Sequence, residues 1–77
     1  MSTIKLSELK IGEKAVIEGI SDSELENKLL DMGCIPGEEI SFERKSPFGD
    51  PSVYFIAGYR LALRKNEASS IIVNKSV

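Results

Sequence analysis

The chain has 77 residues, of which 42% are hydrophobic and 29% are charged, and its formal net charge is −2. This length suits a modest core and leaves little room for a deep substrate cleft. We therefore expect residues 1–77 to form a single folded domain. The negative charge gives no overall attraction to nucleic acid or to anionic lipid.

The distribution of charge along the chain is uneven. Residues 1–43 carry four lysines and ten acidic residues, whereas residues 44–77 carry six basic and two acidic residues. A basic patch would result if the second half formed one face of the molecule. Because the strands of a small barrel interleave, we expect the charges to be mixed instead.

The start of the sequence lacks the apolar run of a signal peptide, and no stretch approaches the roughly 20 apolar residues of a membrane span. The single cysteine, Cys34, excludes an internal disulfide and fits a reducing compartment. We expect a cytoplasmic protein, for which any membrane role comes through a partner.

The first predicted elements are an ambiguous opening and a strand. Apolar residues at irregular spacing between Ile4 and Ile11 favour a short turn of helix near Ser7 as much as a strand. The β-branched run Lys14–Ile20 predicts the first clear strand.

One helix is predicted at residues 23–32. Ser23 and Glu26 fit a capping box, and apolar residues at i, i+4 and i+7 from Leu25 form one stripe. Gly33 then ends the helix, since glycine adopts the left-handed conformation at little cost.

Short strands with tight connections fill the rest of the chain. Pro36-Gly37 and Ala57-Gly58 read as turns, and residues 67–68 as a short helical turn. The remaining predicted strands are Glu39–Lys45, Val53–Ile56, Tyr59–Leu63 and Ser70–Asn74. Alternation puts Ile40 and Phe42 on one face of their strand and points Ile71 and Val73 inward. The pattern predicts a mainly β fold: a small SH3-like β-barrel of about five strands, with one α-helix between strands 1 and 2. An OB-fold also has five strands but places its helix later in the chain.

Catalysis is poorly supported by the residue types present. The chain has no histidine, the side chain most used for proton transfer near neutral pH. Cys34 therefore lacks a histidine to activate it, and its neighbours favour a packing role. We predict that the protein is not an enzyme.

No cofactor or tight metal site is expected. No glycine-rich phosphate-binding motif is present. Asp22, Glu24 and Glu26 are the best carboxylate cluster, but acidic residues are common at the start of a helix, where the dipole favours them.

A nucleic-acid-binding barrel is an alternative with a weaker case. It would combine basic residues such as Arg44, Arg64 and Lys65 with aromatic residues that stack on bases. However, we expect Phe55 and one of Tyr54 and Tyr59 to be needed in the core. The acidic half of the chain would also repel phosphate.

Surface recognition remains the favoured mode of action. Phe48 lies in a loop that contains proline and glycine, where an exposed ring is costly unless it folds back or meets a partner. We expect it to fold back.

Four stretches of the chain carry a family resemblance. They are 6–12 (Leu-Ser-Glu-Leu-Lys-Ile-Gly), 28–37 (Lys-Leu-Leu-Asp-Met-Gly-Cys-Ile-Pro-Gly), 46–51 (Ser-Pro-Phe-Gly-Asp-Pro) and 61–68 (Leu-Ala-Leu-Arg-Lys-Asn-Glu-Ala). In order and spacing they resemble the motifs of the FeoA family, small cytoplasmic proteins of ferrous-iron transport. Lys28 stands where arginine is usual in that family. An ion pair between Arg64 and Glu67 is expected from their i, i+3 spacing.

The resemblance implies a partner, the cytoplasmic GTPase region of the ferrous iron permease FeoB, and an accessory role without catalysis. The residues predicted to bind the partner are Lys28, Asp31, Phe48, Tyr59 and Arg60. The same fold occurs as the C-terminal domain of DtxR-like repressors, so a metal-responsive module is a second alternative. No helix-turn-helix segment precedes the domain, which favours a free-standing protein.

Overall fold

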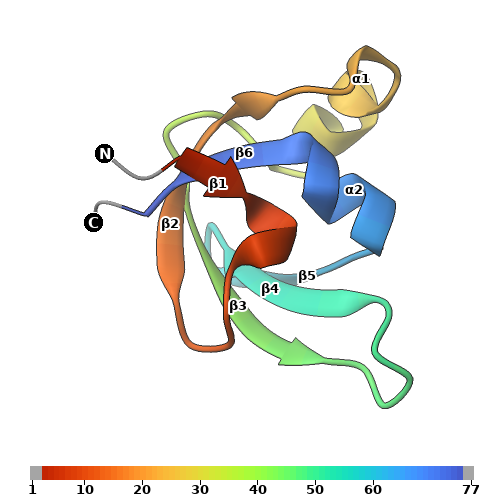
Figure 1. The fold of residues 1–77 in the computed structure, drawn as a ribbon. Coiled ribbons are helices and arrows are strands. Elements are labelled where there is room, and N and C mark those ends of the chain that lie inside the picture. Colours follow the sequence, from red (N-terminus) through yellow and green to blue (C-terminus); the bar gives the residue numbers. More distant parts are fainter. Residues whose placement is uncertain (1–2, 76–77) are drawn as a thin grey trace.

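The computed structural model describes residues 3–75. These residues form one curved, six-stranded sheet with two α-helices and one 3₁₀ turn (Figure 1). In chain order the elements are β1 (Thr3–Lys5), η1 (Leu6–Glu8), β2 (Lys14–Ile20), α1 (Ser23–Asp31), β3 (Glu39–Lys45), β4 (Ser52–Ile56), β5 (Tyr59–Leu63), α2 (Lys65–Ser70) and β6 (Ile71–Asn74).

The strand order is β1-β6-β2-β3-β4-β5, and all neighbouring strands are antiparallel. The prediction of a mainly β fold with a helix between its first two long strands is thus confirmed. The predicted number of about five strands was too low, because the three-residue β1 is too short to show a periodic pattern. No ladder between residues 3 and 75 joins β1 to β5, so the sheet is open at these two edges rather than hydrogen-bonded into a closed barrel.

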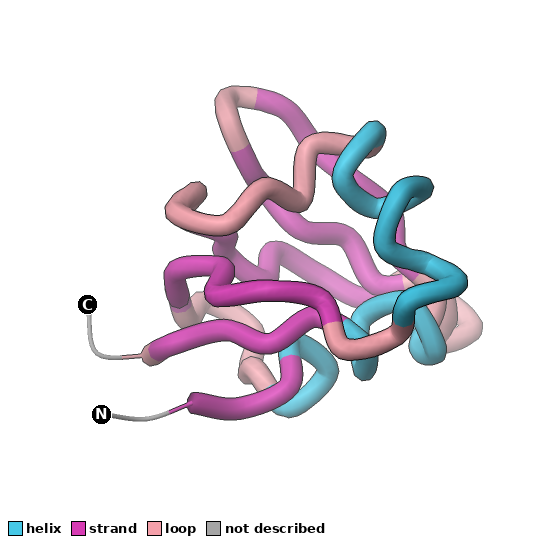
Figure 2. Tube along the Cα trace, turned by 90° about the horizontal axis from the view of Figure 1, so that it is seen from above, coloured by secondary structure: helices cyan, strands magenta, loops and turns pink. Residues whose placement is uncertain are grey.

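Two irregularities bend the sheet around its core. The register shifts between Ile17 and Gly19 in β2, and between Phe42 and Arg44 in β3. Such bulges increase the local twist and curvature of a strand. Figure 2 shows the strands curving around the interior, with α1 and α2 at the same end of the sheet.

The core follows the alternation of each strand. Ile71 and Val73 point inward as predicted, and in β4 the inward residues are Tyr54 and Ile56. Phe55 lies between them and remains 39% exposed, so the expectation that it fills the core was wrong. The largest completely or almost completely buried side chains are those of Leu6, Ile17, Leu29, Ile40, Tyr54, Ile56, Leu63, Ile71 and Val73.

Helix α1 begins at Ser23, whereas a cap at Ser23 would place the first helical residue at Glu24. Asp22 is the N-cap residue, and its carboxylate accepts a hydrogen bond of 2.9 Å from the backbone N–H of Glu24. Ser23 is therefore the first helical residue rather than the cap. At the other end Gly33 has a φ of 103°, and its N–H donates to Leu30. The next N–H donates to Leu29, which completes a Schellman motif.

None of the helices within residues 3–75 is both long and apolar enough to cross a bilayer.

The N-cap assignment predicts different effects for two neighbouring substitutions. Asp22→Ala removes a bonded cap and should lower the free energy of unfolding by about 1 kcal/mol. Ser23→Ala removes a hydroxyl at the first helical position and should change it by less than about 0.5 kcal/mol. Urea unfolding followed by circular dichroism measures both values. A larger loss for Ser23→Ala than for Asp22→Ala would contradict the assignment.

Candidate functional site

The five residues predicted to bind a partner lie in two places. Lys28 and Asp31 are on α1, and Tyr59 and Arg60 begin β5. Phe48 lies in the β3–β4 loop, whereas Tyr59 follows the β4–β5 turn, so the length of β4 separates them. In Figure 1 the β3–β4 loop and α1 lie at opposite ends of the molecule.

Tyr59 fastens the β4–β5 hairpin to the end of α1. Its hydroxyl donates to the carbonyl oxygen of Met32 at 2.5 Å. A Cβ atom added to Gly33 would overlap that hydroxyl oxygen. Gly33 is thus required by its positive φ and also by the close approach of the tyrosine. The hydroxyl of Tyr59 is held in place by this hydrogen bond, while 43% of the residue stays exposed.

Arg60 of β5 contacts one side chain in β3 and one in β4. Its Nε donates to a carboxylate oxygen of Glu43 in β3 at 2.6 Å. Its guanidinium carbon also lies 5.8 Å from the centre of the Phe55 ring, which is its cross-strand partner. A cation over an aromatic face is favourable. The arginine therefore covers part of the ring that the sheet leaves outside.

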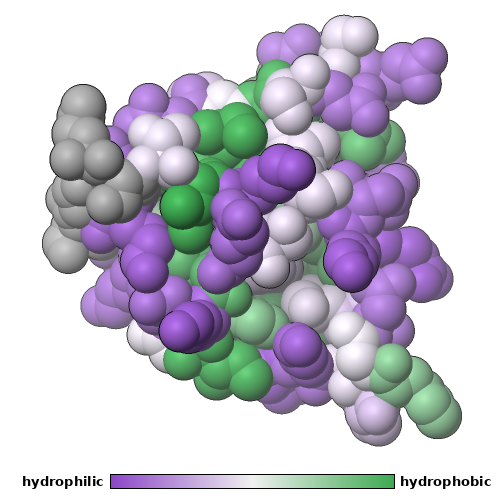
Figure 3. All heavy atoms as spheres, in the orientation of Figure 1, coloured by the Kyte–Doolittle hydropathy of each residue, from purple (hydrophilic) through white to green (hydrophobic). Residues whose placement is uncertain are grey.

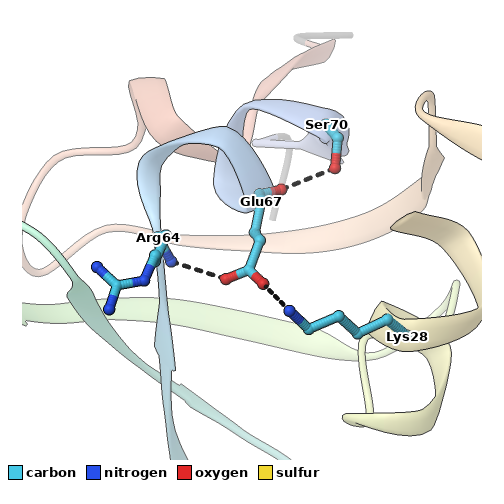
Figure 4. Close-up of polar contacts among 4 residues, drawn as sticks. All are labelled: Lys28, Arg64, Glu67 and Ser70. Carbon is cyan, nitrogen blue, oxygen red and sulfur yellow. Dashed lines mark hydrogen bonds and ion pairs between the residues drawn. The ribbon is translucent and has the colours of Figure 1, made fainter. Parts of the chain in front are cut away.

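Lys28 forms an ion pair that the sequence did not predict. Its Nζ lies 2.8 Å from one carboxylate oxygen of Glu67 in α2, and the other carboxylate oxygen accepts from the backbone N–H of Arg64 at 2.9 Å (Figure 4). The prediction that the Arg64 guanidinium pairs with Glu67 was wrong, because this guanidinium lies 3.7 Å from a carboxylate oxygen of Asp50 instead. Only 9% of the Glu67 side chain is exposed.

The hydrogen bond from Lys28 is the main reason that the pKa of Glu67 is lowered, and burial opposes it. The backbone N–H of Arg64 and the positive charges of both basic residues lower the pKa further. Glu67 is therefore ionised at neutral pH although it is almost buried. Its backbone carbonyl accepts a hydrogen bond of 2.8 Å from the Ser70 hydroxyl.

We use the name hairpin surface for Lys28, Asp31, Phe55, Tyr59 and Arg60, which lie on α1 and on both faces of the β4–β5 hairpin: Tyr59 is opposite the buried Ile56, and Arg60 is opposite the outward Phe55. It offers aromatic area and charge of both signs on side chains that are mostly held by contacts within the chain. Tyrosine and arginine are frequent at the energetic centre of protein interfaces. Sequence reasoning missed Phe55, although strict alternation from the buried Tyr54 and Ile56 assigns it to the outer face.

Phe48 does not fold back onto the sheet, and that expectation was wrong. The residue is 96% exposed. Apolar atoms are visible at the projecting tip of the β3–β4 loop at the lower right of Figure 3. Single exposed apolar side chains are common on protein surfaces, so the exposure of Phe48 does not by itself identify a contact site.

The lone thiol lies in the core. Cys34 is completely buried, and its pKa is raised to about 11, mainly by burial and also by the negative charge of Glu67. In the described part of the chain, no three Cys, His, Asp or Glu side chains gather so that they could hold a metal ion. Asp22, Glu24 and Glu26 are thus not arranged as a metal site.

Comparison with known proteins gives a consistent family. Residues 4–75 match the model of the FeoA domain. The NMR structure of a FeoA-like protein from Clostridium acetobutylicum superposes with a TM-score of 0.90 at 40% identity, covering 100% of this chain and 91% of that one. The crystal structure of zinc-complexed FeoA from Stenotrophomonas maltophilia, described as a prokaryotic SH3 domain protein, gives 0.78 at 32% identity, covering 96% and 91%.

A curated relative from Porphyromonas gingivalis is a fusion of Fe(2+) transport protein A with the Fe(2+) transporter FeoB. It is 35% identical over 71 residues, which are 91% of this chain. The match spans only 8% of the fusion protein.

The lowered pKa of Glu67 predicts a pH-dependent contribution to stability. A carboxyl group whose pKa falls on folding stabilises the protein above its ordinary pKa of 4.5. This contribution is lost as the pH falls through the lower pKa of the folded state. The unfolding free energy of the parent should exceed that of Glu67→Gln at pH 7, and the gap should shrink towards pH 3. A gap that stays constant from pH 7 to pH 3 would contradict the role of the charge.

The contact between Tyr59 and Gly33 predicts that alanine substitution lowers the free energy of unfolding by different amounts at two glycines with similar φ angles. Gly33 and Gly37 have φ values of 103° and 96°, but nothing lies within 4 Å of a Cβ added at Gly37. Gly37→Ala should cost about 1 kcal/mol of unfolding free energy for backbone strain. Gly33→Ala should cost about 1–3 kcal/mol more, because the hydroxyl must move. Equal losses in urea unfolding would argue against a close contact.

Proposed function

Because the chain belongs to the FeoA family, we propose that it is a non-catalytic accessory protein of bacterial ferrous-iron uptake. Residues 1–77 act as one domain with an SH3-like fold in the cytoplasm. The protein works by contact with the cytoplasmic G-protein region of the permease FeoB, and thereby changes uptake.

The fusion protein from Porphyromonas gingivalis carries this proposal. Joining two modules in one chain keeps each at a high effective concentration near the other. Such a fusion is useful when the two modules act together. The Stenotrophomonas relative, described as a candidate activating factor of ferrous iron transport, supports an activating role.

The hairpin surface is the proposed contact with the permease. Tyr59 and Arg60 are already held by Met32 and Glu43, so little side-chain entropy is lost when a partner covers them. Lys28 and Asp31 add charges that select the orientation of the partner. Phe48 is a separate apolar contact at the other end of β4.

A metal-responsive module is the second candidate, and the zinc complex of the Stenotrophomonas protein favours it. Calorimetry with Fe²⁺, Mn²⁺ or Zn²⁺ tests it, and an affinity in the micromolar range would raise it above the first candidate. The nucleic-acid alternative is weakened, because Tyr54, one of its stacking candidates, is only 2% exposed.

The proposal predicts amide shifts when ¹⁵N-labelled protein is titrated with the cytoplasmic domain of the permease. Shifts should cluster at the hairpin surface and the end of α1. Asp31→Lys should weaken binding by about tenfold, because a rim charge is reversed without loss of an internal contact.

Glu26→Lys is the matched control for Asp31→Lys. It makes the same charge change at another exposed position of α1 and should leave the affinity within about twofold. Absence of shifts up to high micromolar concentration, in every nucleotide state, would exclude direct binding to this domain. Equal effects of the two variants would move the contact away from the hairpin surface.

A further inference from the structure

A hollow of about 440 Å³ lies away from the hairpin surface. It is enclosed by η1 and the residues that follow it, by β3 and β4, by the β3–β4 loop and by the start of α2. In Figure 1 these segments surround the lower middle of the view. The volume is within the range of sites that accept a small ligand or a few side chains of a partner.

The apolar floor of the hollow consists of side chains that are almost completely buried, and its rim is mixed. Phe42 and Tyr54 line it with their rings packed against each other, the centres 5.0 Å apart. Leu9 and Ala68 line it as well. At the rim, Ile11 is 60% exposed, and the exposed Phe48 directly precedes the lining residue Gly49. Apolar side chains of an occupant would thus find partners at the edge, where Ile11 and Phe48 are exposed.

The charges around the hollow are mostly positive. Its lining includes Lys10, Lys45 and Lys65 but only one acidic residue, Asp50. Within residues 3–75 the three ammonium groups form no ion pair, and neither do Lys5, Lys14 and Arg44, whereas Lys28, Arg60, Arg64 and Lys75 do.

Asp50 is already engaged inside the chain. One oxygen accepts from the backbone N–H of Lys65 at 3.0 Å, and the other lies 3.7 Å from the Arg64 guanidinium. The hollow is therefore a cationic site on a protein whose net charge is −2.

We propose that this hollow binds an acidic, apolar segment of a partner protein, with carboxylates at the three lysines and aliphatic or aromatic side chains against Ile11 at the rim and Phe48 beside it. The site is separate from the hairpin surface and does not depend on binding to the permease. An occupant of this kind satisfies the unpaired lysines and covers Ile11 at the same time.

A protein segment fits better than a nucleic acid. Nucleic acid would bring many phosphates to an acidic protein, whereas a short segment carries few charges and places them only at the rim. Tyr54 offers little ring surface for stacking, since it is 2% exposed. Burial raises the pKa of its hydroxyl, so the phenol remains neutral.

The test uses a terminally blocked synthetic peptide of about ten residues that alternates Glu with Leu and Phe. A second peptide replaces each Glu by Lys, and a third probe is a single-stranded oligothymidylate. Each is titrated into the ¹⁵N-labelled protein at low and at high salt. The acidic peptide should shift the amides of Lys10, Lys45, Gly49 and Lys65, and the shifts should weaken with salt. The basic peptide should leave them unchanged.

Lys45→Gln with Lys65→Gln should weaken binding of the acidic peptide by about tenfold. The double variant Lys5→Gln with Lys14→Gln makes the same charge change at exposed lysines outside the lining and should keep the affinity within about twofold. Urea unfolding checks that both variants remain folded. No shift up to about 1 mM acidic peptide, equal binding of the basic peptide, or tighter binding of the oligonucleotide would each overturn the proposal.

Discussion

The arrangement of this small protein depends on one almost buried carboxylate. Glu67 lies where α1 and α2 meet, and burying its charge is unfavourable unless it is paired and hydrogen-bonded. Lys28 supplies the opposite charge from α1, and the Arg64 N–H supplies a hydrogen bond from the start of α2. The carboxylate therefore holds two segments together that are far apart in the sequence. Helix α2 leads directly into β6, which lies between β1 and β2 in the sheet.

The end of α1 in turn contacts the β4–β5 hairpin. The end of the helix is a Schellman motif around Gly33, and Tyr59 rests on it. Two exposed regions result at opposite ends of β4. One is a surface of braced polar and aromatic groups, and the other combines a protruding ring with a cationic hollow. A single short strand thus separates the two surfaces at which we propose contacts with other macromolecules.

The sequence predicted most of the fold but only part of the site, and particular residues show why. Alternation placed Ile40, Phe42, Ile71 and Val73 inside, because one face of each strand is buried. Glycine and proline marked the turns. Long-range partners left no local signal: Glu67 pairs with Lys28 across 39 positions of the chain rather than with Arg64 three positions away. The exposure of Phe48 could not be predicted from the local sequence pattern either, because it depends on how far the β3–β4 loop projects from the sheet.

The burial of Cys34 has a practical consequence. Its sulfur is enclosed in the core and protonated at neutral pH, so it neither cross-links nor competes for thiol reagents while the protein is folded. A cysteine introduced on the surface would be the one accessible thiol, because Cys34 is the single cysteine of the sequence and is buried. A fluorophore or spin label attached there would report on its own surroundings alone, and the hairpin and the hollow could be observed one at a time in an otherwise unaltered chain.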